Sequence, residues 1–156
     1  MIAQAKKENH AALVALCGLC GLRVAEALAV RASHFDLSRM MLLVHGKGDK
    51  EREVPVSTAA WEVLAHPVAR SFCHDDALVV GLKDRFARTV ITNLADMSGL
   101  QRHVSSHDLR ATFATAVYDK TLNQRLVQEL LGHSSGTTTE VYIGVSQKNL
   151  KMGVEL

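Results

Sequence analysis

Apolar residues in the amino-terminal part of the chain recur at three- and four-residue intervals, which is the spacing of a helix with one buried face. Residues 3–16 predict a first helix on this pattern, with Ala12, Leu13 and Leu16 on its apolar side. A second helix is predicted over residues 22–31. Glycines separate the two stretches, so the chain is expected to begin with two short helices.

The pattern changes at Met40, where a continuous apolar run replaces the helical spacing. A turn that contains Gly46 and Gly48 follows, and residues 52–56 form a second run with extended character. Strand, glycine-bearing turn and strand in this order predict a β-hairpin, the only convincing one in the sequence.

Ser57 is expected to cap a helix that runs to about residue 65. Pro67 is expected to close this helix, because proline disfavours a helix interior. Residues 70–81 are then predicted to be mainly a connection.

Polar caps and glycines bound the remaining helical stretches. These are residues 85–97 after Asp84, residues 107–119 after Ser105 or Ser106, the segment between Asn123 and Gly132, and residues 138–145. The predicted fold class is mainly α with a small antiparallel β-hairpin or sheet, that is, α+β.

At 156 residues the chain fits one domain, and no repeat, linker or low-complexity tract divides it. Its formal net charge of +2 permits DNA binding without indicating it. No apolar run is long enough for a membrane helix, and residues 1–10 are polar. We therefore expect an intracellular protein.

The three cysteines raise the possibility of redox chemistry or zinc binding, because Cys17 and Cys20 form a Cys-x-x-Cys pair. No second pair lies at ligand spacing, and Cys73 with His74 is an isolated dipeptide. We expect buried thiols at an apolar helix end and no metal site.

Several polar residues in four short segments are not needed for packing. They are Arg23, Lys47, His107, Arg110, His133 and Tyr142. This set is rich in hydrogen-bond donors, has one weakly acidic hydroxyl, and suits a phosphodiester as its target. Each signal alone is weak: Arg23 and Glu26 could form an ordinary surface ion pair, and Lys47 could be a solvated turn residue.

Attack on a phosphodiester builds negative charge on two non-bridging oxygens, with which guanidinium groups pair bidentately. Arg23 and Arg110 would form this clamp and do the work often given to Mg²⁺. A tyrosine with its ordinary pKa near 10 is about 0.1% ionised at pH 7, so forming its phenolate costs about 4 kcal/mol without help. His107 or the arginines could give that help.

The leaving alkoxide needs a proton, and a lysine on a flexible hairpin can deliver it. We assign this role to Lys47, with Lys50 and Arg52 as rival candidates nearby.

The order and spacing of these residues resemble the tyrosine recombinases, the phage-integrase and Xer-like DNA strand-exchange enzymes. The resemblance covers essentially the whole chain. Its blocks are Gly21-Leu22-Arg23 with Glu26, Gly46-Lys47-Gly48, Ser106-His107 with Leu109-Arg110, Leu131-Gly132-His133, and Tyr142 nine residues (142 − 133) after His133. Ala111 stands where many members have a second histidine, a position outside the catalytic set.

The resemblance implies the tyrosine recombinase catalytic-domain fold over residues 1–156, with the family's amino-terminal core-binding domain absent from this chain. It implies a site-specific recombinase or integrase that cleaves and rejoins duplex DNA through a 3′-phosphotyrosine intermediate, without metal, ATP or another cofactor. By the same resemblance Tyr142 is the nucleophile and Lys47 protonates the leaving oxygen. Residues that bind and activate the phosphate are Arg23, His107, Arg110 and His133, with Glu26 in a supporting role.

The partners follow from the same resemblance. They are a duplex recombination site and further copies in a homo-tetramer on DNA, with the 146–156 tail docking on a neighbouring copy. Contacts with the DNA backbone are expected from Lys83, Arg85, Arg88, Lys50 and Arg52. The expected location is on DNA in the cytoplasm of a bacterial or phage-infected cell.

Two other functions remain open at this point. A type IB topoisomerase shares the phosphotyrosine chemistry and would relax DNA as a monomer. A non-catalytic DNA-binding or assembly module of recombinase descent would need neither Tyr142 nor its supporting residues, all of which are present.

Overall fold

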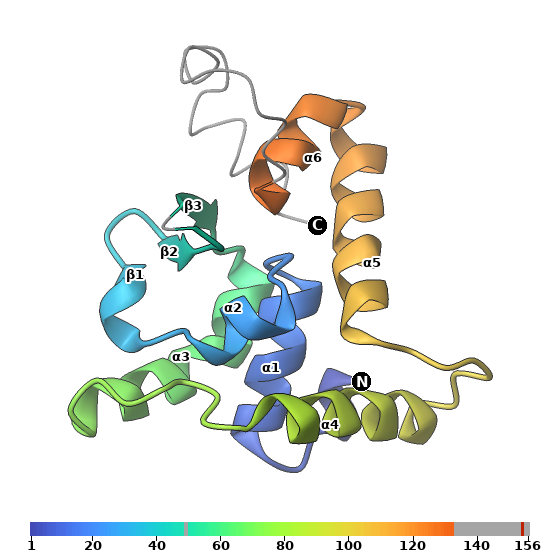
Figure 1. The fold of residues 1–156 in the computed structure, drawn as a ribbon, viewed down its shortest axis with the longest axis horizontal. Helices are drawn as coiled ribbons and strands as arrows, with labels where there is room; N and C mark the ends of the chain where they lie inside the picture. Colours follow the sequence, from blue (N-terminus) through green and yellow to red (C-terminus); the bar gives the residue numbers. More distant parts are fainter. Residues whose placement is uncertain (49, 133–153, 155–156) are drawn as a thin grey trace.

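The computed structural model describes residues 1–48, 50–132 and 154. It is mainly helical, with one small antiparallel sheet (Figure 1), as the sequence predicted. Its helices are α1 (Glu8–Gly18), α2 (Val24–Leu28), α3 (Thr58–Cys73), α4 (Asp84–Met97), α5 (Ser106–Thr121) and α6 (Gln124–Leu131), with short 3-10 turns at Ile2–Gln4 and Ala32–His34. None of the helices in this described part combines the length and the apolar character that crossing a bilayer requires.

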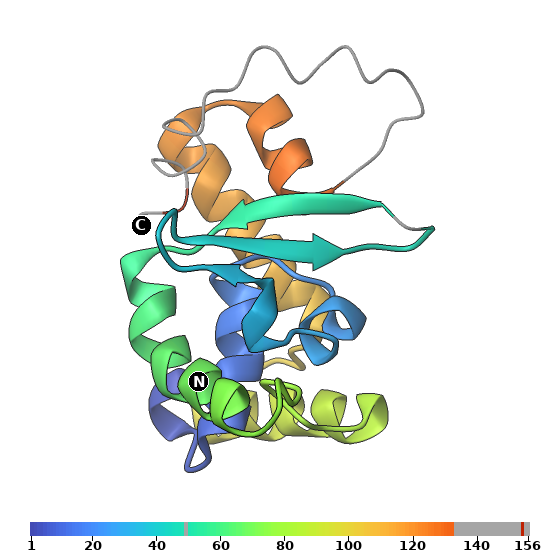
Figure 2. The ribbon, with the colours of Figure 1, turned by 90° about the vertical axis from the view of Figure 1, so that its left-hand side faces the viewer.

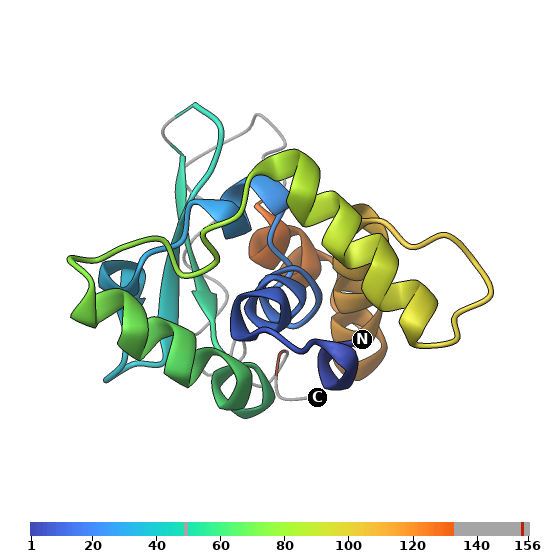
Figure 3. The same ribbon diagram turned by 90° about the horizontal axis from the view of Figure 1, so that it is seen from below.

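Helix α1 lies at the centre of the molecule, with α2, α3, α4 and α5 packed around it (Figure 3). Six consecutive residues of this helix, from Ala12 to Cys17, are buried. A helix that is apolar on nearly every side belongs in the interior of a domain, where several partners can cover it.

The sheet contains three strands in the order β1 (Phe35–Asp36), β2 (Met41–His45) and β3 (Glu51–Pro55), all antiparallel. The long β2–β3 hairpin extends beyond the helices in Figure 2. Strand β1 was not predicted, because two residues are too short for a period-two pattern to appear. It forms through pairing of Phe35 with Leu42 and of Asp36 with Met41.

Buried apolar side chains form two clusters. The main cluster draws on residues 12–104, from α1 to the segment that follows α4. The second cluster is smaller and holds α6 against α5. Its members are Phe113, Val117, Leu126, Leu130, Leu131 and Val154. Val154, the one described residue of the 146–156 tail, is 2% exposed and packs within its own chain.

The prediction that Pro67 ends a helix was wrong. Helix α3 continues through this proline to Cys73, so part of the expected 70–81 connection is helical. Pro67 is itself buried, together with Leu64 and Val68, and Ser71 near the end of the helix accepts a hydrogen bond from the Ala32 amide. Burial of this face outweighs the single backbone hydrogen bond that proline removes.

Three predicted helix caps, Ser57, Ser105 and Asn123, are confirmed and one is displaced. Ser57 and Asn123 accept hydrogen bonds from the amides of Ala60 and Leu126. Asp84, however, is the first helical residue rather than the cap, and its carboxylate pairs with Arg88 one turn later at 2.8 Å. An acidic residue in the first turn still suits the helix dipole. The helix predicted over residues 138–145 lies outside the described residues.

Candidate active site

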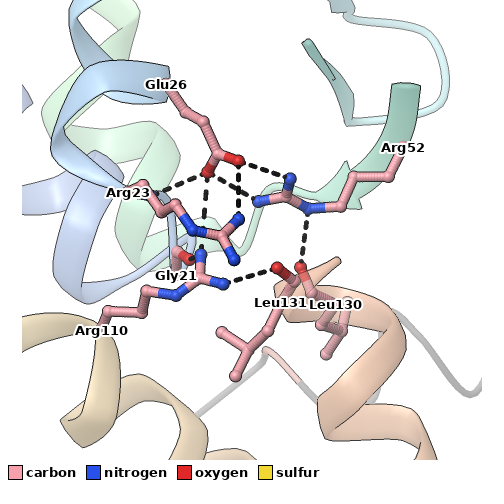
Figure 4. A network of polar contacts seen from close by, with 7 residues as sticks. All are labelled: Gly21, Arg23, Glu26, Arg52, Arg110, Leu130 and Leu131. Atoms are coloured by element: carbon pink, nitrogen blue, oxygen red, sulfur yellow. Dashed lines mark hydrogen bonds and ion pairs between the residues drawn. The ribbon is translucent and has the colours of Figure 1, made fainter. Parts of the chain in front are cut away.

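One buried carboxylate organises the polar residues of the site. The side chain of Glu26, on α2, is 6% exposed and receives three guanidinium groups from different elements (Figure 4). Arg23 lies 3.1 Å from its Oε1, Arg52 2.9 Å from the same oxygen, and Arg110 3.7 Å from Oε2. Charges buried to this degree need paired, hydrogen-bonded surroundings, which the three arginines supply.

Arg23 stands where the chain enters α2, and it is bound to Glu26 twice. Its backbone amide donates to Oε2 at 2.8 Å, and its guanidinium donates to Oε1 at 3.1 Å. The Arg23 side chain is nevertheless 45% exposed. Its charged group is therefore held in place and open to a ligand at the same time.

Arg110, in the first half of α5, is almost entirely buried, with 8% of its side chain exposed. It donates to the carbonyl oxygen of Gly21 at 2.5 Å and to that of Leu131 at 2.6 Å. Burial, and secondly the charge of Arg23, lower the pKa of Arg110 to about 10. It still carries its full charge at neutral pH.

Arg52 also turns inward, from strand β3. Two nitrogens of its guanidinium donate to the two oxygens of Glu26, each at 2.9 Å, and Nε donates to the carbonyl oxygen of Leu130 at 3.0 Å. Sequence reasoning expected this arginine to contact DNA and found no sign of the inward contacts. The expected contact of Arg52 with DNA is untested and stays a prediction, whereas its bonds within the protein are observed.

The ionisation of Glu26 reflects two opposing effects. Burial alone would raise its pKa, but the hydrogen bonds from Arg52 and Arg23 and their charges outweigh burial, so the pKa lies below the ordinary value of 4.5. Glu26 is an anion at neutral pH, and the four charged groups form a cluster with a net positive charge of two. Such a cluster attracts a phosphate.

Lys47 lies in the β2–β3 turn and is exposed. The turn is closed by a 2.7 Å hydrogen bond from the Gly46 amide to the Lys50 carbonyl, and Gly48 has a positive φ of 75°. A Cβ on Gly46 would lie 3.8 Å from Oε1 of Glu26. The turn that carries Lys47 therefore starts next to the arginine cluster.

His107 lies one turn before Arg110 in the first turn of α5 and is exposed. Ser105 caps this helix, accepting from the Asp108 amide at 3.4 Å, while Asp108 accepts from the Ser105 amide at 2.8 Å. The Ser105 hydroxyl also donates to the Asp108 carboxylate at 2.6 Å, and this bond, the bond from the Ser105 amide and the bond from Arg102 hold the pKa of Asp108 well below its usual range. His133 and Tyr142 lie outside the described residues.

Comparison with known proteins identifies the family of the chain. The sequence profile described as "Phage integrase family" matches residues 1–149. The chain belongs to the phage integrase family. The match spans all four elements that meet at the arginine cluster, and it confirms the resemblance inferred from the sequence blocks.

Individual relatives agree with this assignment. The tyrosine recombinase XerC of Corynebacterium glutamicum is 39% identical over 150 residues, which cover 91% of this chain and 48% of that protein. The integrase from mycobacterium phage Brujita superposes with a TM-score of 0.82 at 25% identity, covering 99% of this chain and 53% of the integrase. The XerH recombinase bound to its difH substrate gives a TM-score of 0.73 at 27% identity, covering 96% of this chain and 48% of XerH.

These matches confirm the predicted fold, that of the catalytic domain of tyrosine recombinases. The chain spans about half the length of the curated relatives it matches.

The other basic residues singled out from the sequence lie on the surface. Lys83, Arg85 and Arg88 are exposed at the start of α4, which packs beside α2 (Figure 3), and Lys50 is exposed in the hairpin. Arg88 is paired with Asp84. Their contact with DNA stays a prediction.

The cysteine pair fits the expectation of buried thiols. Cys17 and Cys20 are fully buried at the end of α1, and burial raises the pKa of both thiols to about 12. Thiols of this kind are protonated and poorly reactive at neutral pH.

Gly21 is a position where the site depends on the absence of a side chain. Its φ is 69°, and a Cβ there would come within 2.6 Å of Cε1 of Phe113. We expect Gly21→Ala to lower the free energy of unfolding by about 2–3 kcal/mol, because a left-handed alanine and a clash with a buried ring add together. Urea denaturation measures the change.

Gly99→Ala is the matched control. Gly99 has a similar φ of 73°, but nothing lies within 4 Å of the point that a Cβ would occupy, so only the backbone cost of about 1 kcal/mol is expected. Equal losses of unfolding free energy in Gly21→Ala and Gly99→Ala would show that the contact with Phe113 does not constrain position 21.

Proposed function

We propose that this chain is the catalytic domain of a site-specific DNA recombinase or integrase that cleaves and rejoins duplex DNA through a 3′-phosphotyrosine intermediate. The observation that carries the proposal is the cluster in which Glu26 holds Arg23 and Arg110 together, one open to solvent and one buried. Membership of the phage integrase family and the likeness to XerH bound to its difH substrate support DNA as the target.

In the proposed mechanism the oxygen of Tyr142 attacks the scissile phosphorus, and the bond to the 5′ oxygen breaks. The guanidinium groups of Arg23 and Arg110 balance the charge that develops on the non-bridging oxygens. His107 and His133 also bind the phosphate, and in this proposal His107 accepts the proton that Tyr142 loses. Lys47 gives the leaving 5′ oxygen its proton. The phosphotyrosine keeps the bond energy, so a 5′ hydroxyl from another strand can reverse the step and release Tyr142.

Four copies of the chain fit this reaction. Exchange between two duplexes breaks four strands, and each copy supplies one Tyr142. We therefore propose a homo-tetramer on DNA, in which the 146–156 tail leaves its own chain, where Val154 is buried, and docks on the next copy. The proposed place of action is DNA in the cytoplasm of a bacterial or phage-infected cell.

The test is covalent trapping of the protein on DNA. The polypeptide that carries this chain is incubated with labelled duplex fragments of its source genome, each nicked just beyond a candidate cleavage point so that the cut strand diffuses away. We expect a denaturant-stable adduct on a 3′ phosphate, and no adduct with Tyr142→Phe, because phenylalanine lacks the attacking oxygen.

The possible outcomes separate the competing functions. An adduct that persists in Tyr142→Phe would place the nucleophile elsewhere. DNA binding without any adduct would favour a non-catalytic assembly module. Adducts with relaxation of supercoiled DNA by a monomer, and no strand exchange, would favour a topoisomerase.

A further inference from the structure

Arg52 is the most completely engaged of the three arginines around Glu26. Its three guanidinium nitrogens all donate within the protein, two to the Glu26 carboxylate and Nε to the Leu130 carbonyl. Only 10% of its side chain is exposed, compared with 45% for Arg23. Its position suits a contact inside the protein better than a contact with a DNA phosphate.

The two groups that Arg52 joins are far apart in the sequence. Glu26 lies on α2 beside Arg23, and Leu130 lies in the last turn of α6. A guanidinium at the carboxyl end of a helix is favourable, because the last carbonyl groups lack partners within the helix. Arg52 thus ties the end of α6 to the carboxylate that holds Arg23.

The glycine at position 132 is independent evidence that the chain accommodates the contact between Arg52 and the end of α6. It follows α6 with a φ of 64°, and a Cβ at this position would lie 2.8 Å from Cδ of Arg52 and 2.9 Å from its Nη1. A residue with a side chain would displace the guanidinium. Gly132 therefore serves both the left-handed helix end and the close approach of Arg52.

Arg52 also belongs to the hairpin that carries Lys47. It pairs with Val44 across β2 and β3, two residues from Gly46, the glycine that lies next to Glu26. The two bonds to the carboxylate fix both the position and the rotation of this end of the hairpin.

We propose that Arg52 is a positioning residue of the active site, which sets the Lys47 hairpin and the end of α6 against Glu26 and does not contact DNA. This inference rests on the proposed function. A planar fork is required, because one guanidinium bridges two carboxylate oxygens and a carbonyl. The single ammonium group of a lysine cannot reproduce that geometry.

The experiment compares Arg52→Gln, Arg52→Lys and Gly132→Ala with the wild type on the trapped substrate. Two quantities are measured: the single-turnover cleavage rate below the melting temperature, and the equilibrium affinity for DNA at several salt concentrations. Arg39→Gln is the matched control. Arg39, in the turn between β1 and β2, donates two hydrogen bonds of 2.8 and 2.7 Å to Glu53 on β3, but its side chain is 38% exposed.

We expect cleavage by Arg52→Gln to be slower by about 10²-fold, since small misplacement of reacting groups has effects of this size. Arg52→Lys should be slowed almost as much, and Arg39→Gln should match the wild type. DNA affinity should stay within about threefold, with the salt dependence of binding unchanged. The double variant with Gly132→Ala should be slowed by clearly less than the product of the two single effects, because both changes break the Arg52 contact and only the strain at the left-handed helix end is added.

Three results would overturn the proposal. A weaker affinity with a salt slope reduced by about 1 would make Arg52 a phosphate contact. A lower melting temperature with an unchanged cleavage rate would make its role purely structural. Multiplicative effects of Arg52→Gln and Gly132→Ala would separate the two residues. A wild type that forms no adduct contradicts the proposed function itself, whereas a cleaving wild type with an equally fast Arg52→Gln contradicts only the positioning role.

Discussion

A Glu26→Gln variant is expected to lose about 3–5 kcal/mol of unfolding free energy at neutral pH, because removing one partner of a buried ion pair leaves uncompensated charge. Here the side chains of Arg52 and Arg110, 10% and 8% exposed, would keep their charges without the carboxylate. The neutral amide can accept one of the hydrogen bonds but cannot balance two buried cations. Urea denaturation followed by circular dichroism measures the loss.

The pH dependence of this difference provides an internal check. The pKa of Glu26 is lowered by folding, so its contribution is complete above the ordinary value of 4.5 and is lost as pH falls through the lower value of the folded protein. The difference in unfolding free energy between the wild type and Glu26→Gln should therefore be complete at pH 7 and decrease progressively below pH 4.5.

Glu53→Gln is the control for this prediction. Glu53 also binds an arginine through two hydrogen bonds, but 43% of its side chain is exposed. Exposed pairs contribute about 0–1 kcal/mol, so the change should be small. Similar losses at Glu26 and Glu53 would contradict the view that burial makes the cluster important.

Arg110→Lys is expected to slow covalent cleavage by about 10²–10³-fold, which is the effect of losing one donor to charge that develops in the transition state. The guanidinium of Arg110 bonds the Gly21 and Leu131 carbonyls, which uses two of the five N–H donors of an arginine. A lysine has three N–H donors, so with both carbonyls bound it would have one donor left and could not pair with a phosphate bidentately. Single-turnover trapping measures the rate.

Arg102→Lys is a suitable comparison for Arg110→Lys. Arg102 lies on the loop before the same helix, is 63% exposed, and pairs with Asp108 at 3.2 Å. The cleavage rate of Arg102→Lys should equal that of the wild type. If Arg110→Lys were equally fast, the buried arginine would be a structural residue and not part of a phosphate clamp.

The sequence was sufficient to predict the positions of most described helices, the hairpin and the family, because each depends largely on local signals. The caps at Ser57, Ser105 and Asn123 are fixed by hydrogen bonds within three residues, and the Arg23–Glu26 pair spans one turn. Helix α3 could not be predicted in full, because the face that carries it past Pro67 is stabilised by distant parts of the core.

The place of Arg52 is the clearest example of what local signals leave out. Its partner Leu130 lies 78 residues away and contributes a backbone carbonyl, which no side-chain pattern reveals. One signal was available: Arg52 occupies the same side of β3 as the buried Val54, an unusual place for a charge on an alternating strand. The arginine cluster as a whole could not be predicted from the sequence, because only the fold brings Arg52 and Arg110 to Glu26.

The cluster joins the two hydrophobic cores, and this has a consequence for how the protein is made. Synthesis on the ribosome releases Arg23, Glu26 and Arg52 before Arg110 and α6 exist. A nascent chain with only its main core therefore lacks half of the phosphate clamp. Under the proposed function, the capacity to break DNA arises only in the finished protein, so incomplete products of translation are harmless to the chromosome nearby.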